Sequence, residues 1–123
     1  MKKLSVTLIL AIAGSIGLAD QTFAHALLKS ARPPVNGTVT NAPTEFDLMF
    51  SEDISLKFSG IKVTGPDKAA VQTGEAMLMD NNTMLVTPVS GTLAPGTYTV
   101  EWQALSGDGH KTHGSYKFTI KPQ

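Results

Sequence analysis

Apolar and polar side chains alternate along several short stretches of the chain. From Glu45 to Phe50 and from Thr97 to Ala104 every second side chain is apolar, and the pattern recurs from Ser115 to Ile120. A period of two is typical of a β-strand with one buried and one solvated face. No useful length of sequence after residue 25 has the periodicity of an amphipathic helix.

Shorter segments predict further strands. Ile61 and Val63 alternate with polar neighbours, and Met84–Thr87 is an apolar run. Proline and glycine interrupt the chain about every ten residues, which suits an all-β domain. We therefore expect a seven-stranded antiparallel Greek-key β-barrel or sandwich of Ig-like type. The predicted core contains the aromatic residues Phe46, Phe50, Tyr98, Trp102 and Phe118.

The beginning of the chain has the three-part pattern of a secretory signal peptide. Two lysines precede the uncharged apolar stretch Leu4–Leu18, and a short polar segment follows it. This stretch is shorter than the roughly 20 residues of a membrane-spanning helix, so an uncleaved anchor is the less favoured alternative.

Two cleavage positions have the small residues that signal peptidase requires. Cleavage after Ala24 makes His25 the first residue, and cleavage after Ala19 makes Asp20 the first. We favour Ala24, because a polar segment of ordinary length then follows the apolar stretch. The predicted organisation is a signal peptide at 1–24 and one periplasmic domain at 25–123, with no membrane segment in the mature form.

The charge balance and the composition of the chain exclude several classes of function. The ten basic and ten acidic residues balance and are scattered, whereas nucleic acids and anionic membranes select basic patches, so we expect neither as a partner. The absence of cysteine excludes thiolate metal sites and cysteine nucleophiles. A tight metal site must then use histidine, carboxylate, methionine, backbone or the terminal amine.

The three histidines indicate a metal site by their positions. His110 and His113 lie between the two clearest predicted strands, and His25 is the predicted mature N-terminus. The α-amino nitrogen and ring Nδ1 of an N-terminal histidine form a chelating pair that suits tetragonal Cu(II). Asp108 and His110 are two residues apart, so an extended loop would point both side chains the same way.

These groups together supply three nitrogens and one oxygen, which favours Cu(II) over Mg(II) or Ca(II), although Zn(II) accepts the same ligands. The alternative is purely structural, because Asp-Gly is a strong turn signal and a loop histidine is usually only solvated. His113 is either an accessory ligand or a solvated residue at a strand start, and we favour the solvated interpretation.

Several segments resemble motifs of the CopC family of periplasmic copper-binding proteins. They are Phe50–Glu52, Phe58–Lys62, Leu93–Trp102 and Ser106–Thr112, in the family's order, with His25 after a signal peptide. The resemblance implies a Greek-key β-barrel and a role in copper sequestration, transport or resistance. The resemblance also implies that the protein functions together with a CopD-like inner-membrane protein.

The same resemblance implies a Cu(II) site made by the terminal amine and ring of His25 together with Asp108 and His110. Glu52 matches a family glutamate, so it is either a neighbouring acceptor or weak ligand of the copper site, or a surface residue at a strand end.

The chain departs from copper-resistance members of the family in one respect. They carry a methionine-rich loop for Cu(I), but the corresponding stretch Val63–Thr73 contains no methionine. Met77, Met79 and Met84 come later, and Met77 and Met79 would share a strand face, where we expect packing. The sequence therefore predicts a member that binds Cu(II) only.

Two other function classes are compatible with parts of the sequence. Copper held by an N-terminal histidine also resembles the site of lytic polysaccharide monooxygenases, which are oxidative enzymes. The only tryptophan here occupies a core-facing position of a predicted strand, so we expect no enzyme. The other class is a metal-free Ig-like structural module.

Overall fold

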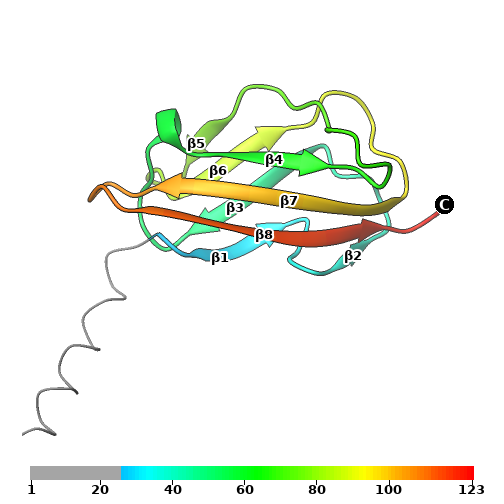
Figure 1. Ribbon diagram of the computed structural model, residues 1–123, viewed down its shortest axis with the longest axis horizontal. Helices are drawn as coiled ribbons and strands as arrows, with labels where there is room; N and C mark the ends of the chain where they lie inside the picture. The colour runs from blue at the N-terminus through cyan, green and yellow to red at the C-terminus, as the bar shows by residue number, and fades with distance from the viewer. Residues whose placement is uncertain (1–25) are drawn as a thin grey trace, which may run out of the picture.

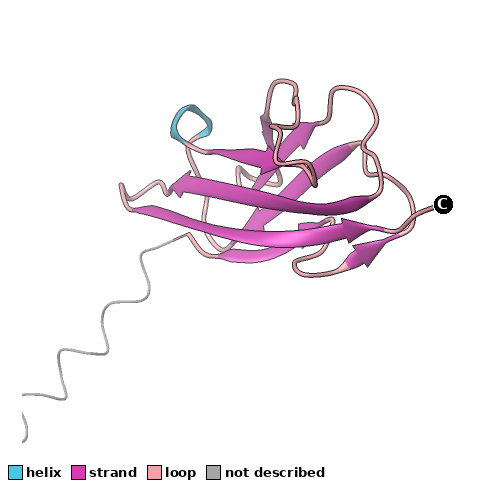
Figure 2. Cartoon of the chain, turned by 45° about the vertical axis from the view of Figure 1, so that its right-hand side comes forward, coloured by secondary structure: helices cyan, strands magenta, loops and turns pink. Residues whose placement is uncertain are grey.

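The computed structural model describes residues 26–123, which form two β-sheets packed face to face (Figure 1). The first sheet contains, in order, β1 (Leu28–Arg32), β3 (Glu45–Phe50), β6 (Met84–Pro88) and β5 (Met77–Met79). The second contains β2 (Thr38–Val39), β8 (Lys111–Ile120), β7 (Gly96–Leu105) and β4 (Gly60–Thr64). A helical turn, η1 (Leu56–Phe58), precedes β4, and the rest of this described part consists of the strands and the loops that connect them (Figure 2).

The predicted all-β sandwich is confirmed, with two differences in detail. The described residues form eight strands rather than seven, and β2 pairs with β8 in parallel, with Thr38 opposite Thr119. Strand β2 has only two residues. A segment this short cannot show alternation in the sequence, since its pairing depends on where β8 passes.

The core lies between the sheets. Phe46, Phe50, Tyr98 and Phe118 are all at most 3% exposed, as the alternation predicts. Trp102 differs, because it is only partly buried at the edge of the core, where its ring meets that of Phe50 edge-on at 5.3 Å. The register places Trp102 opposite Gly114, and the missing Cβ of Gly114 leaves the space for the indole.

The longest structural unit is the β7–β8 hairpin. The two strands pair from Gly96 opposite Ile120 to Leu105 opposite Lys111. Burying one face of this ribbon against the first sheet fixes its register, because a slip of one residue would turn the apolar side chains outward. The hairpin therefore holds its connecting loop, residues 106–110, at one end of the sandwich (Figure 1).

Candidate metal site

The loop between β7 and β8 is closed by its own polar groups. The Ser106 amide donates to the carbonyl of His110 at 2.9 Å, and the Gly109 amide donates to the carbonyl of Ser106 at 2.9 Å. Gly109 has φ +93°, which favours glycine. The Asp108 carboxylate accepts from the His110 amide at 3.2 Å and from the Ser106 hydroxyl. This is the usual way an aspartate stabilises a turn.

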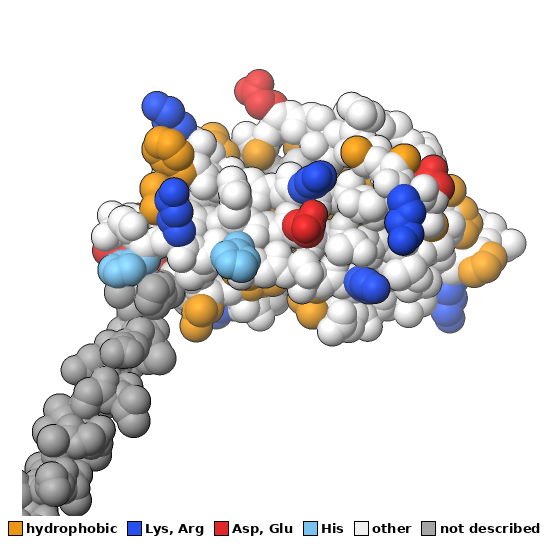
Figure 3. Space-filling model, in the orientation of Figure 1, with side chains coloured by type: hydrophobic (Ala, Val, Ile, Leu, Met, Phe, Trp, Pro, Cys, Tyr) orange, Lys and Arg blue, Asp and Glu red, His pale blue; other side chains and the backbone are white. Residues whose placement is uncertain are grey.

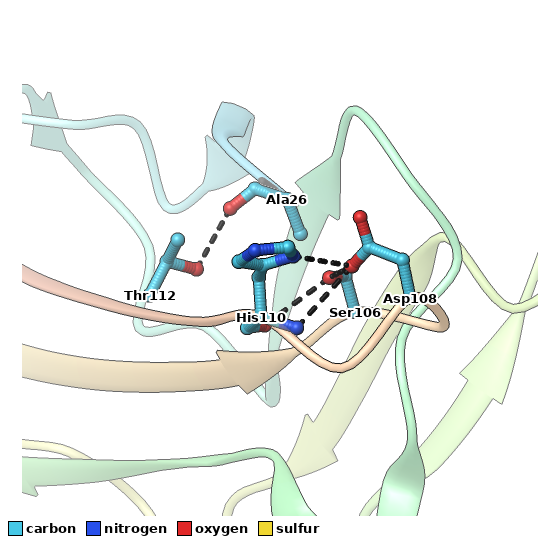
Figure 4. Close-up of polar contacts among 5 residues, drawn as sticks. All are labelled: Ala26, Ser106, Asp108, His110 and Thr112. Atoms are coloured by element: carbon cyan, nitrogen blue, oxygen red, sulfur yellow. Dashed lines mark hydrogen bonds and ion pairs between the residues drawn. The ribbon is translucent and has the colours of Figure 1, made fainter. Parts of the chain in front are cut away.

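The same loop brings Asp108 and His110 together. His110 Nδ1 lies 3.2 Å from Asp108 Oδ1 (Figure 4), and the two side chains are 44% and 50% exposed for Asp108 and His110 respectively. All three contacts of the carboxylate use Oδ1, so Oδ2 is not engaged by them. The predicted convergence of these two side chains is thus present in the structure.

The electrostatics of the loop keep the carboxylate charged. The hydrogen bond from Ser106 is the largest influence, and together with the weaker contributions of His110 it holds the pKa of Asp108 below its ordinary value against the opposing effect of desolvation. An ionised carboxylate is an acceptor only, and it can bind a cation without first losing a proton. The loop therefore presents an anionic oxygen beside an imidazole.

The start of the described chain is fixed next to this pair. Thr112 donates its hydroxyl to the carbonyl of Ala26 at 2.8 Å (Figure 4). Leu27 and Ser51 exchange two hydrogen bonds, from the Leu27 amide to Ser51 Oγ and from the Ser51 amide to the Leu27 carbonyl, both at 2.9 Å. Ala26 is fully buried. The chain thus enters the domain two residues along β8 from His110.

The predicted ligand His25 and the predicted signal peptide lie outside the described residues. Within residues 26–123 no group of three or more histidine, aspartate and glutamate side chains is placed to hold a metal ion. The same range contains no helix that is long and apolar enough to span a membrane. Of the three predicted metal ligands, the described residues therefore contain Asp108 and His110.

The two acidic residues that follow β3, Glu52 and Asp53, differ in their contacts with the loop. Glu52 is exposed and makes no hydrogen bond or ion pair with the residues of the described range. Asp53 instead accepts from the Gly107 amide at 3.1 Å through its carbonyl, and Asp53 Oδ2 lies 2.7 Å from where a Cβ on Gly107 would be. Ile54 forms an isolated bridge with Ser106.

Asp53 is therefore the acidic residue that contacts the loop, although it belongs to none of the sequence motifs. The sequence feature that could have indicated this contact is the glycine between Ser106 and Asp108, because a glycine often permits the close approach of another chain segment. That signal does not say which segment approaches.

His113 lies apart from the Asp108–His110 pair. It is exposed on β8 opposite Gln103, and it faces away from the core. Figure 3 shows histidine side chains at separate places on this side of the molecule, with basic and acidic side chains near the more central one. His113 lines a shallow groove on the second sheet together with Gly60, Ile61, Lys62, Glu101, Trp102, Gln103, Gly114 and Ser115.

Comparison with known proteins gives consistent matches over almost the whole described chain. The CopC domain family matches residues 28–121. Protein YobA of Escherichia coli strain K12 is 41% identical over 113 residues, which cover 91% of this chain and 91% of YobA. Copper resistance protein C of Pseudomonas syringae pv. tomato is 38% identical over 109 residues, covering 80% of this chain and 82% of that protein.

Solved structures agree with these matches. PcoC, a methionine-rich copper resistance protein from Escherichia coli, has a TM-score of 0.71 at 36% identity over 80% of this chain and 100% of PcoC. CopC from Methylosinus trichosporium OB3b has a TM-score of 0.71 at 29% identity, covering 80% of this chain and 96% of that structure. The two-sheet fold, the family match and these relatives together show that the chain belongs to the CopC family.

Proposed function

We propose that this protein binds Cu(II) in the periplasm and sequesters or carries it, without catalysing a reaction. Signal-peptide cleavage after Ala24 would free the α-amino group of His25. That amine and the ring Nδ1 of His25 would hold the ion with Asp108 and one ring nitrogen of His110. Two relatives named copper resistance protein C, at 35% and 38% identity, support copper as the ligand.

The observation that carries this proposal is the attachment of Ala26 beside the loop. Its carbonyl is bonded to Thr112, two residues after His110. Consecutive Cα atoms are about 3.8 Å apart, so a mature chain that began one residue before Ala26 would begin close to that point. The half site of Asp108 and His110 needs nitrogen ligands from elsewhere, and a mature N-terminus at His25 would supply two.

The donor chemistry supports Cu(II) over other divalent ions. Three nitrogens and one carboxylate oxygen suit a tetragonal ion, whereas Mg(II) and Ca(II) prefer oxygen ligands. Zn(II) prefers a tetrahedral arrangement of the same groups. Oδ2 of Asp108 is the oxygen left available, while Oδ1 holds the loop.

The proposed location and partner rest on the sequence and the relatives. Residues 1–24 would direct export, and residues 25–123 would form the mature domain. The copper transport protein CutJ of Bacillus subtilis matches 84% of this chain with only 19% of its own length. A domain of this kind thus occurs within a longer copper transport protein, which supports a CopD-like inner-membrane protein as the partner.

The decisive experiment is a Cu(II) titration against a competing chelator, with protein purified from the periplasm and its N-terminus verified by mass. We expect one tightly bound ion per chain that starts at His25. An alanine added before His25, and separately His110→Ala, should each weaken binding by about a hundredfold or more.

The matched control is His113→Ala, which removes a histidine from the same hairpin and should leave the affinity unchanged. If the alanine extension binds as tightly as the unaltered chain, the amine is not a ligand and the proposed site is wrong. If a chain with a verified His25 start binds Cu(II) only weakly, the copper-carrier proposal itself fails.

A further inference from the structure

The outer face of the first sheet, which turns away from the core, carries a buried carboxylate. In β3, Phe46 and Leu48 are fully buried between the sheets. Their strand neighbours Glu45 and Asp47 therefore project from the opposite face, because successive side chains of a strand alternate. Asp47 is nevertheless only 7% exposed. An aspartate is almost never this deeply buried unless its charge is paired.

Apolar side chains surround Asp47 on this face. The strand register places Asp47 opposite Val86 of β6, and Val86 and Met84 are both buried there. Met77 and Met79 of β5 share the face and are each 48% exposed, contrary to the expectation that they pack. Asp47 therefore lies at the side of an apolar layer, where an unpaired charge is costly.

The two oxygens of the Asp47 carboxylate differ in their contacts. Oδ2 accepts a hydrogen bond from Arg32 Nη2 at 3.1 Å, and Arg32 lies directly opposite on β1. Oδ1 is buried and has no donor within residues 26–123. A buried acceptor without a donor destabilises a folded protein, so most such atoms have a partner. The structure therefore leaves room for one more donor at Oδ1.

Glu45 is the group that can supply this donor. It lies two residues from Asp47 on the same face of β3, and its carboxyl group is within hydrogen-bonding reach of Asp47. The hydrogen bond and the negative charge of Asp47, and then desolvation, raise the pKa of Glu45 against the opposing charge of Arg32. Two ionised carboxylates can only accept and repel each other, whereas a protonated carboxyl group donates one hydrogen bond.

The neighbouring strands add few other charges. Within residues 26–123, the charged residues on β1 and just before β5 are Arg32, Lys29 and Glu75. Strands β5 and β6 contain no charged residue. When both carboxylates are ionised, Glu45, Asp47 and Arg32 together carry one negative charge, and a single bound proton neutralises it.

We propose that Glu45 and Asp47 form a proton-binding pair, which holds one proton between the two carboxyl groups in acid and releases it as the pH rises. The proton lies between Glu45 and Oδ1 of Asp47, while Arg32 remains on Oδ2. The pair goes beyond the proposed Cu(II) function, because it needs no metal and lies on the other sheet from the strands that carry the Asp108–His110 loop.

The pair should stabilise the domain in acid. A raised folded pKa contributes stability that is fully present below the ordinary pKa of glutamate and is lost as the pH rises through the folded value. Imidazole and amine ligands become protonated in acid and release their ion, which removes the stabilisation that a bound metal gives. The pair would then keep the metal-free domain folded; this consequence, but not the pair itself, rests on the proposed function.

The test combines thermal unfolding of the metal-free mature protein between about pH 4 and about pH 7.5 with an NMR titration of the Glu45 carboxyl carbon. We expect a raised pKa for Glu45, which Asp47→Asn should move back toward the ordinary value. Glu45→Gln supplies a permanent amide donor to Asp47. Its melting temperature should exceed that of the unaltered protein by a few degrees at neutral pH, and this difference should shrink on acidification.

The matched control is Glu52→Gln, because Glu52 is an exposed residue shortly after the same strand. This variant should keep the pH dependence of the unaltered protein. If Asp47→Asn does not fold, Glu45→Gln at its exposed position decides the question. The assignment is wrong if Glu45→Gln and the unaltered protein depend on pH in the same way.

Addition of Ca(II) tests the other occupant that two carboxylates could hold, a cation. We expect no change in melting temperature. If Ca(II) raises the melting temperature of the unaltered protein but not of Glu45→Gln, the pair binds a metal ion and the assignment of a proton is overturned. All these measurements use metal-free protein, so a failed Cu(II) titration leaves them unaffected and the two proposals fail separately.

Discussion

The hydrogen bond from Thr112 to Ala26 allows the positioning of the chain start to be tested quantitatively. Thr112→Val keeps the side-chain shape and removes the hydroxyl that donates to the Ala26 carbonyl at 2.8 Å. Ala26 is fully buried, so its carbonyl would lose its partner without gaining water. An unpartnered buried acceptor costs about 1–3 kcal/mol, and we expect a loss of about 1–2 kcal/mol in the free energy of unfolding.

The same bond should matter for metal binding. If it holds the chain start against the loop, its removal adds a positioning cost of about 0.5–1.5 kcal/mol to Cu(II) binding. That cost corresponds to an affinity about two- to tenfold weaker. The assays are urea unfolding of the copper-free protein and chelator competition for Cu(II), both with mature chains of verified N-terminus.

The matched control is Thr119→Val, farther along the same strand. The Thr119 hydroxyl shares an exposed hydrogen bond of 2.9 Å with Thr97, and its loss should change stability by less than about 0.5 kcal/mol without affecting Cu(II) affinity. If Thr112→Val is destabilised yet binds Cu(II) as tightly as the unaltered protein, the reasoning that this bond positions the site is refuted.

Three further predictions concern the loop, the sheet and the core. Ser106→Ala removes the largest contribution to the lowered pKa of Asp108, so it should destabilise the protein at neutral pH. Because a lowered folded pKa contributes stability above the ordinary pKa and loses it on acidification, the difference from the unaltered protein should shrink below about pH 4, as pH-dependent urea unfolding will show. Gly114→Ala would place a Cβ 2.8 Å from the Trp102 ring, and the overpacking should cost about 1–3 kcal/mol and alter tryptophan fluorescence; an unchanged unfolding midpoint would contradict this. Phe46→Ala empties a fully buried position between the sheets and should cost about 3–5 kcal/mol in urea unfolding, so a loss below about 1 kcal/mol would disprove its core role.

Local pattern was sufficient for the strands that build the domain. The alternation in Glu45–Phe50 and in Thr97–Ala104 follows from side chains projecting to opposite faces of a strand, and both segments are strands in the structure. The Asp108–His110 pair was also predictable, because two residues in one short loop come together through local hydrogen bonds alone.

Contacts between distant segments, and the burial of individual side chains, could not be predicted from local pattern. No motif in the sequence indicates that Asp53 contacts Gly107. Trp102 fits the alternation as well as Tyr98 does, yet it lies at the edge of the core, because burial depends on how far the opposite sheet extends. The exposure of Met77 and Met79 likewise depends on β5 being an edge strand.

The class of fold, the family and the residue types available for a metal could be predicted from the sequence, because they depend on periodicity, motifs and composition along the chain. Which distant segments meet is visible in the folded chain alone. Ala26 reaches Thr112 across 86 positions of sequence, and Met84 lies between Met49 and Met79 through strand register alone. The physical reason is that the pairing of strands is set by burying one face of each sheet in a common core, an interaction that no local stretch of sequence contains.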